Sequence, residues 1–437
     1  MSTTQERTEP DVARLADALA EARRFTEALV APLGDAELLQ QFSTLQSPLA
    51  WDLAHIAHFE ELWLVREIVG GGGSNPHFDD LYNSFAHPRG ERITLDILQP
   101  AEARTFLTEV RERTLAVLPR LREAPDPRLG RDGFAVGLVV QHELQHAETM
   151  CQTLQTASGL VYRHEDEPSP ELAAGGKSAE VLVPTGPFTL GTSSEPWAYD
   201  NEREAHVVDL PAFSIDATAV TNAAYLAFID DGGYRDRRHW SDDGWAWLQA
   251  ERADAPLYWH RCGKAWRRLR FGTTEHVPAA EAVQHVSWFE ADAYARWAGR
   301  RLPTEAEWEK AATTTPDGAK LALPWGTGPH HGKANVGRNR FAPAPVGDYP
   351  QGASPLGCLG MIGDVWEWTS SAFTAYPGFA AFPYREYSEV FFGDTYRVLR
   401  GGSWASHPIV ARPTFRNWDH AHRRQIFSGF RCARNAS

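Results

Sequence analysis

Apolar residues recur at helical spacing between residues 11 and 160. A spacing of three and four places one apolar stripe along each segment, which is typical of helices that pack around a shared core. Such segments are predicted over residues 11–33, 47–69, 101–121 and 133–158. Ser47 is a candidate N-cap, with Pro48 at the first helical position. The pattern predicts an up-and-down four-helix bundle with one long loop, residues 70–99.

The pattern changes beyond residue 162. Residues 163–179 are polar and contain Pro and Gly, which indicates a linker. After it, short apolar segments alternate with Gly and Pro turns, beginning with two short strands between Val181 and Gly191. Helices are predicted over residues 222–230 and 288–297, and a third from Thr304, whose capping box includes Glu307. We therefore predict a helical domain (1–162), a linker (163–179) and an α+β domain with little regular secondary structure (180–437).

Composition narrows the class of protein. The 437 residues are 43% apolar and 23% charged, as in a soluble globular protein. The net charge of −14 argues against a nucleic-acid partner, and no apolar run is long enough to cross a membrane. The polar N-terminus lacks a signal-peptide pattern, and the four cysteines show no C-x-x-C spacing. A cytoplasmic protein, expected to be a monomer, fits these features.

Two histidines in the fourth predicted helix form the most informative motif. His142 and His146 are four residues apart, so they lie on one helix face and can share a metal ion. His55, in the second predicted helix, is the best candidate for a third ligand in a bundle core. His58, three residues further on, remains an alternative. His77 and His87, in the long loop, are weaker candidates.

The same motif has a second interpretation. His142-Glu143-x-x-His146 matches the helix of zinc metallopeptidases, in which the glutamate is the general base. Such an enzyme needs a third metal ligand further along the chain. Glu165 and Glu167 are the candidates, although both lie in the predicted linker. A pair of histidines that binds no metal also remains open.

Further motifs are spread along the chain, and they resemble two joined families. The N-terminal part resembles a DinB-type four-helix bundle, with His55, His142 and His146 in the places of the metal ligands. The C-terminal part resembles the formylglycine-generating-enzyme/sulfatase-modifying domain, a C-type-lectin-like fold. The motifs that carry this second resemblance are Phe188–Gly191, Val286–Trp288, Arg301–Glu309, Gly363–Trp368, Arg400–Trp404 and Gly429–Arg431. The cysteine pair that holds copper in formylglycine-generating enzymes has no counterpart.

The two halves together resemble the sulfoxide synthases of ergothioneine biosynthesis, the hercynine oxygenases. The resemblance implies a non-haem iron enzyme that binds Fe(2+) and uses O2 to join a thiol sulfur to C2 of the hercynine (trimethylhistidine) imidazole, with oxidation to the sulfoxide. Residues 416–427 resemble the actinobacterial branch, whose thiol is γ-glutamylcysteine. Free cysteine or a selenosugar donor remains an alternative, as do a zinc peptidase and a binding module without catalysis.

The resemblance also implies which side chains bind the substrates. Arg89, Arg92, Asp419 and Arg423 are expected around the thiol, where a carboxylate suits the substrate ammonium and guanidiniums suit its carboxylates. Without the resemblance, Asp419 and Arg423 would be interpreted as a surface ion pair.

Hercynine carries a quaternary ammonium group, which favours aromatic faces because it has no N–H to donate. The residues expected near it are Gln145, Tyr387, Asn417 and Trp418. Tyr384 is expected to be the catalytic proton donor, with Tyr376 and Tyr387 as alternatives.

Overall fold

The computed structural model describes residues 11–164 and 179–436. These residues fall into two compact units: one contains the chain up to Arg163 together with Glu195–Trp197, and the other contains the rest. Three residues beyond the predicted linker therefore belong with the helical unit. Residues 165–178 of that linker, including Glu165 and Glu167, lie outside the described residues.

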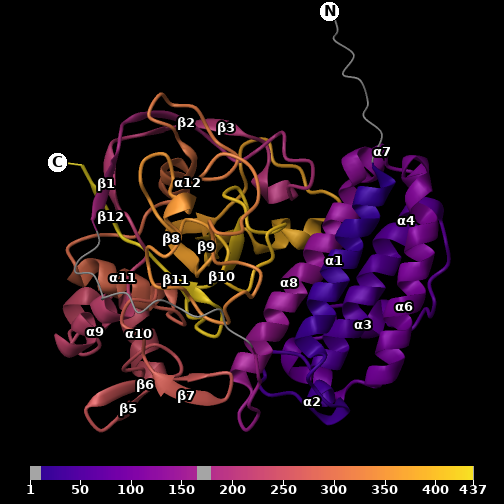
Figure 1. Ribbon diagram of the computed structural model, residues 1–437, viewed down its shortest axis with the longest axis horizontal. Coiled ribbons are helices and arrows are strands. Elements are labelled where there is room, and N and C mark those ends of the chain that lie inside the picture. Colours follow the sequence, from indigo (N-terminus) through magenta and orange to yellow (C-terminus); the bar gives the residue numbers. More distant parts are fainter. Residues whose placement is uncertain (1–10, 165–178, 437) are drawn as a thin grey trace, which may run out of the picture. The chain divides into compact units, whose positions relative to one another are not determined.

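The first unit is the predicted four-helix bundle. Its long helices lie side by side in Figure 1, and they are α1 (Val12–Val30), α3 (Leu49–Glu60), α6 (Pro100–Val117) and α8 (Phe134–Thr156). Helix α3 packs against both α6 and α8, and α1 packs against α8. The connections hold α2 (Asp35–Leu39), a π-helical turn (Glu61–Arg66), α4 (Glu67–Val69), α5 (Phe78–Leu81), α7 (Pro127–Gly130) and 3-10 turns at Arg89–Thr94, Leu118–Glu123 and Arg131–Gly133.

The start of α3 differs from the prediction. Pro48 is the N-cap, in an extended conformation, and Ser47 does not cap the helix. The Ser47 hydroxyl instead accepts a hydrogen bond from Arg92 Nη1, at 2.7 Å. This bond ties the long loop to the beginning of α3.

The second unit contains the three helices predicted from the sequence. They are α9 (Asn222–Asp230), α11 (Trp288–Trp297) and α12 (Glu305–Thr313). The capping box of α12 forms as expected: the Thr304 hydroxyl accepts from the Glu307 amide, and the Glu307 carboxylate accepts from the Thr304 amide. A fourth helix, α10 (Asp242–Glu251), was not predicted, although Ser241 caps it.

Short strands form small sheets in this unit. The largest has the order β10-β9-β8-β11 and consists of β10 (Asn417–His420), β9 (Gly393–Arg400), β8 (Trp366–Phe373) and β11 (Ser428–Gly429). A second sheet joins β1 (Glu180–Val183), β4 (Phe213–Asp216) and β12 (Ala433–Asn435), a third pairs β2 (Gly186–Leu190) with β3 (His206–Leu210), and a fourth joins β5 (Trp259–Cys262), β6 (Ala265–Arg270) and β7 (Thr273–His276). The two predicted strands after residue 180 thus exist, but they belong to different sheets.

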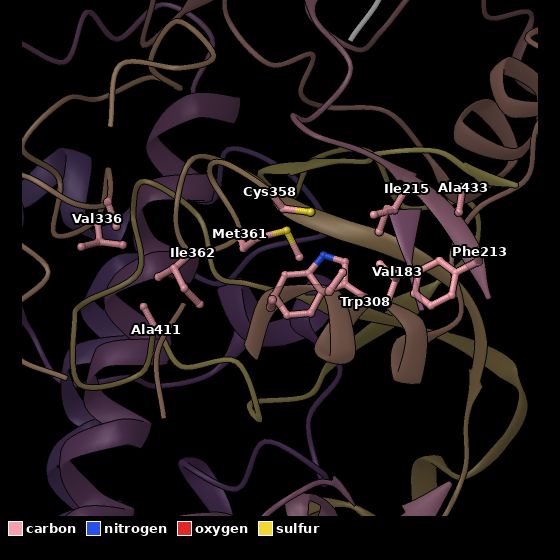
Figure 2. Close-up of a cluster of buried hydrophobic side chains, with 13 residues drawn as sticks. Val183, Phe213, Ile215, Trp308, Val336, Cys358, Met361, Ile362, Ala411 and Ala433 are labelled. Atoms are coloured by element: carbon pink, nitrogen blue, oxygen red, sulfur yellow. The ribbon is translucent and has the colours of Figure 1, made fainter. Parts of the chain in front are cut away.

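The core of this unit forms around Trp308 of α12 (Figure 2). The indole lies among aliphatic and sulfur-containing side chains of distant segments, including Val183, Ile215 and Met361. Its Nε1 donates to the buried Glu367 carboxylate at 2.8 Å, and the same carboxylate pairs with Arg431. Burial of apolar surface is the main force that stabilises this core. The Trp308 Nε1–H and the Glu367 carboxylate have partners within it, which offsets the cost of burying polar groups.

Candidate metal centre

Three imidazoles converge inside the bundle. His55 comes from α3. His142 and His146 come from α8, where their spacing of four residues places both rings on one face of the helix. One ligand nitrogen from each residue lies within 4.8 Å of the others, and the Nε2 atoms of His55 and His142 are 3.2 Å apart. Among the described residues, no other group of three histidine, cysteine or carboxylate side chains comes together in this way.

The ring orientations suit a metal. His55 Nδ1 lies 2.7 Å from the Tyr82 carbonyl oxygen, and His146 Nδ1 lies 3.1 Å from Asp52 Oδ1. A ring that donates from Nδ1 keeps the Nε2 lone pair available for a metal, so these acceptors select the coordinating tautomer.

Aromatic layers hold two of the rings in place. Trp51 stacks on His55 with centroids 4.6 Å apart, and the Arg92 guanidinium lies 3.6 Å above the Trp51 ring centre. Phe59 stacks on His142 at 3.7 Å. The rings therefore have little freedom to rotate away from one another.

Burial lowers the pKa of His55 and of His142 well below the ordinary value, and the neighbouring His146 adds to the effect. Both rings are thus neutral near pH 7, which is the form that coordinates a cation. Neutral imidazoles with open positions fit a mononuclear non-haem iron site, and they also accept zinc.

Glu143 has a role that the peptidase interpretation does not predict. Its carboxylate is 2% exposed and accepts from Arg23 Nε at 2.8 Å and from Arg111 Nη2 at 3.4 Å. The same two guanidiniums bind Glu60, at 3.0 Å and 2.7 Å. Arg23, Glu60, Arg111 and Glu143 come from α1, α3, α6 and α8 respectively. We call this set the four-helix ion cluster.

The zinc-peptidase alternative fails on this geometry. Its general base must face the metal-bound water, whereas Glu143 is occupied by two arginines within the bundle. His142 and Glu143 are adjacent in sequence, so they project about 100° apart around α8. One helix thus carries a candidate metal ligand on one face and an ion pair on another.

The other histidines considered do not join the triad. His58 Nε2 lies 3.5 Å from Asp79, and His87 Nε2 lies 3.4 Å from Asp80. His77 is exposed at the start of α5. The third position therefore belongs to His55.

The expected thiol-binding residues of the bundle differ in their surroundings. Arg92 is 3% exposed and donates to Ser47 Oγ and to the carbonyls of His87 and Ser84. Burial lowers its pKa to about 10. Arg89 is exposed. Gln145, expected near hercynine, is half-buried on α8 between the two histidines.

In the second unit, Asp419 and Arg423 do form an ion pair, with 3.5 Å between Oδ1 and Nε. Each side chain is about one quarter exposed, 23% and 25%. Asp419 lies on strand β10, and a turn follows in which the Arg423 amide donates to the His420 carbonyl. The pair therefore closes a turn at the end of a strand.

The aromatic residues expected around hercynine are neighbours in this unit. Trp418 stacks on Phe373 with ring centroids 4.1 Å apart. Tyr387 lies edge-on to Trp418, with ring centroids 5.7 Å apart. Tyr384 lies edge-on to Tyr387 at 6.2 Å. The Asn417 carboxamide oxygen accepts from the Trp418 amide.

The tyrosines of this region differ in environment. Burial raises the pKa of Tyr384 well above its ordinary value, and the nearby Tyr199 and Asp200 add to the effect. The phenol is therefore protonated near pH 7. Tyr376 is 6% exposed and donates to Glu305 at 3.2 Å, with the Arg416 guanidinium 4.0 Å above its ring. Tyr376 is thus part of the core, which leaves Tyr384 and Tyr387 as the candidates.

Sequence reasoning missed the groups that orient the triad. Asp52 precedes His55 by three residues, so its place on the same helix face was a usable signal. The Tyr82 carbonyl and the Phe59 stack had no such signal, because they depend on the fold of the loop and on packing between helices.

No helix among the described residues has both the length and the apolar character needed to cross a membrane. The same residues contain four free cysteines, of which Cys262 is exposed.

Comparisons with known proteins agree with this architecture. Residues 18–150 match the DinB superfamily, and residues 167–436 match the sulfatase-modifying factor enzyme 1-like domain. A hercynine oxygenase of Mycolicibacterium thermoresistibile is 50% identical over 438 residues, which cover 97% of this chain and 95% of that protein. A hercynine oxygenase of Mycolicibacterium smegmatis is also 50% identical, over 96% of this chain and 98% of its own.

A formylglycine-generating enzyme of Streptomyces coelicolor is 33% identical over 300 residues, which cover 62% of this chain and 93% of that protein. Since the full-length relatives match nearly the whole chain, and both domain families match in order, the protein belongs to the hercynine oxygenase family of oxidoreductases.

Proposed function

We propose that the protein is an iron(II)- and O2-dependent sulfoxide synthase that joins the sulfur of γ-glutamylcysteine to C2 of the hercynine imidazole. The C2–H and S–H bonds break, a C–S bond forms, and sulfur is oxidised to the sulfoxide. O2 accepts the four electrons, so that one oxygen atom enters the sulfoxide and the other leaves as water. The observation that carries the proposal is the convergence of His55, His142 and His146 in a family of hercynine oxygenases.

The triad would hold iron through the three Nε2 atoms, while Asp52 and the Tyr82 carbonyl fix the orientation of two rings. Bound iron(II) would supply the redox chemistry that O2 requires, with open positions for substrates. The stacked rings of Trp51 and Phe59 would keep the neutral imidazoles of His55 and His142 in place when the metal binds.

The hercynine site would use aromatic faces and two amides. Trp418 and Tyr387 meet at right angles, and such faces suit a trimethylammonium group, which cannot donate a hydrogen bond. Gln145 and Asn417 carry carboxamides that would bind the imidazole or the carboxylate. The neutral Gln145 suits a place between two ligand histidines because it adds no charge.

The thiol substrate carries one ammonium and two carboxylates. Asp419 would bind the ammonium, and Arg423 with the exposed Arg89 would bind carboxylates through paired N–H donors. The buried Arg92, whose guanidinium lies over the Trp51 ring, would add positive electrostatic potential at the site. Its hydrogen bond to Ser47 would at the same time hold the long loop. Free cysteine has a single carboxylate, whereas γ-glutamylcysteine has one carboxylate more for these guanidiniums to bind. A selenosugar has no carboxylate and would leave these cations unpaired.

Tyr384 would donate a proton during sulfur transfer. The phenol is protonated at neutral pH, as a proton donor must be, and its raised pKa means that it gives up the proton only to a strongly basic acceptor. Tyr387 remains the alternative donor, although its contact with Trp418 favours a place in the hercynine site.

The proposal is tested with anaerobically purified protein reconstituted with iron(II) or with zinc. We expect the iron form to convert hercynine, γ-glutamylcysteine and O2 into the sulfoxide conjugate, and we expect kcat/KM to fall when cysteine replaces the dipeptide. Conversion by the zinc form alone would contradict the assignment of iron. Equal kcat/KM for both thiols would contradict the assignment of γ-glutamylcysteine as the thiol substrate. Tyr384→Phe should shift product from the conjugate towards oxidised thiol, and an unchanged ratio counts against that role.

A further inference from the structure

The segment that carries Tyr384 and Tyr387 has little secondary structure of its own. Residues 382–388 contain one 3-10 turn, Arg385–Tyr387, and contribute to no sheet. We call this segment the tyrosine loop. A loop of this kind needs fixed contacts at its ends if its side chains are to keep one orientation.

One buried carboxylate contacts both ends of the tyrosine loop. Asp200, 5% exposed, accepts from the Phe382 amide through Oδ2 at 3.2 Å and from the Ser388 hydroxyl through Oδ1. Phe382 and Ser388 are the first and last residues of the loop. Asp200 precedes them by more than 180 residues.

The neighbours of Asp200 add two further contacts. Asn201 Nδ2 donates to Ser388 Oγ at 3.0 Å, so this hydroxyl links both side chains. Tyr199 stacks on Tyr387 with ring centroids 4.1 Å apart and planes inclined by 22°. Three consecutive residues, Tyr199 to Asn201, therefore hold the tyrosine loop.

The tripeptide is itself fixed to the core. Arg416 Nη1 donates to the Asn201 carbonyl at 2.9 Å, and Arg416 also pairs with the buried Glu305. Glu202, which follows the tripeptide, is fully buried and pairs with Arg412. Both arginines lie in the segment that connects β9 to β10, and Arg416 directly precedes β10.

Burial raises the pKa of Asp200, whereas the hydrogen bonds from Ser388 and the Phe382 amide oppose the rise. A carboxylate that keeps its charge binds its donors more strongly than a neutral amide would. Its charge is also among the causes that raise the pKa of Tyr384.

We propose that Asp200 is a positioning residue, which holds the tyrosine loop so that the Tyr384 phenol is presented as a proton donor in a single orientation. The inference rests on the proposed role of Tyr384. Asp200 does not itself touch the substrates. It acts through Ser388 and the Phe382 amide, with Asn201 and Tyr199 as supports.

The test compares Asp200→Asn and Ser388→Ala with Asp394→Asn, a matched control at an exposed position on β9. Each variant is made with 3-fluorotyrosine at position 384, and the fluorine resonance is recorded together with thermal stability. We expect one narrow resonance in the wild type and the control, and a broadened or split resonance in Asp200→Asn and Ser388→Ala.

The same variants, without the label, are assayed for the ratio of sulfoxide conjugate to oxidised thiol. Loss of one hydrogen bond to a charged group should lower this ratio by about tenfold, with KM for the thiol little changed. A folded Asp200→Asn variant with an unchanged resonance and ratio would overturn the inference.

The two hypotheses fail separately. If Tyr384→Phe leaves the product ratio unchanged, the role of Tyr384 is wrong, whatever the resonance shows. If Tyr384→Phe changes the ratio but Asp200→Asn and Ser388→Ala do not, only the role of Asp200 is wrong. A fall in thermal stability without a change in resonance or ratio indicates a structural role alone.

Discussion

The bundle and the C-terminal unit position their candidate functional side chains in different ways. In the bundle, helical spacing brings His142 and His146 together, and one histidine from α3 completes the set. In the C-terminal unit, Tyr384, Tyr387 and Trp418 come from a loop and a strand whose geometry depends on distant buried carboxylates. A helix thus carries its own geometry, whereas a loop takes its geometry from the core around it.

Both units also bury charged groups, and the arrangements are comparable. The four-helix ion cluster links one residue from each long helix. In the C-terminal unit, Arg400 and Arg416 share Glu305. Removal of one partner from such a set leaves an uncompensated buried charge, which is costly even where the intact set adds little stability. These clusters therefore fix the arrangement of segments more than they add to the total free energy of unfolding.

The largest effect is expected from His142→Ala, which removes one of the three proposed metal ligands while leaving the C-terminal unit intact. Iron binding and turnover should both be lost, because two imidazoles do not hold the ion tightly. Metal content by elemental analysis and an O2-consumption assay measure this. His77→Ala, at an exposed position on the long loop, is the control and should retain both. Full turnover in His142→Ala would refute the triad.

The next effect is expected from Glu143→Gln. Two guanidiniums lose a charged partner, so the free energy of unfolding of the bundle should fall by roughly 3–5 kcal/mol. Urea unfolding followed by helical circular dichroism measures the change. Glu112→Gln, at an exposed position on α6, should change the free energy by less than about 0.5 kcal/mol. Normal stability combined with complete loss of activity would instead support a general base at Glu143.

A smaller effect, confined to one substrate, is expected from Trp418→Ala. Loss of an aromatic face should weaken hercynine binding by about tenfold, while iron content stays the same because the ligands lie in the bundle. Titration calorimetry with hercynine measures the affinity, and Trp259→Ala on β5 serves as the control. Unchanged hercynine affinity would remove Trp418 from the proposed site.

The smallest effect concerns pH, and it should have opposite signs in the two units. Although burial alone raises the pKa of Glu60, Arg111 and Arg23 lower it below its ordinary value of 4.5. This contribution to stability is complete above pH 4.5 and is lost as pH falls further. By contrast, burial raises the pKa of Asp364 to about 6 from an ordinary value of 3.8. Its contribution therefore falls as pH rises from about 4 to about 6.

The variants Glu60→Gln and Asp364→Asn separate these contributions. Each should flatten the pH dependence of the free energy of unfolding in its own range. If neither variant changes its slope, the two carboxylates do not titrate as described.

Much of the architecture follows from local sequence. The helices around His142 and Trp288, and the capping box at Thr304, depend on contacts within three or four residues, so they were predicted close to their observed bounds. The helix at Asp242–Glu251 was missed, and the N-cap of α3 was misplaced by one residue. Chain geometry alone determines helical spacing, which is why the pair His142 and His146 was evident from the sequence.

Tertiary structure decided which histidine joins that pair and what Glu143 does. His55 and His58 are three residues apart on one helix, and only packing of α3 against α8 selects His55. Glu143 meets arginines 120 and 32 residues away. The Asp200 contacts with the tyrosine loop likewise span more than 180 residues. Contacts of this range depend on how whole elements pack, which no periodicity within a short segment encodes.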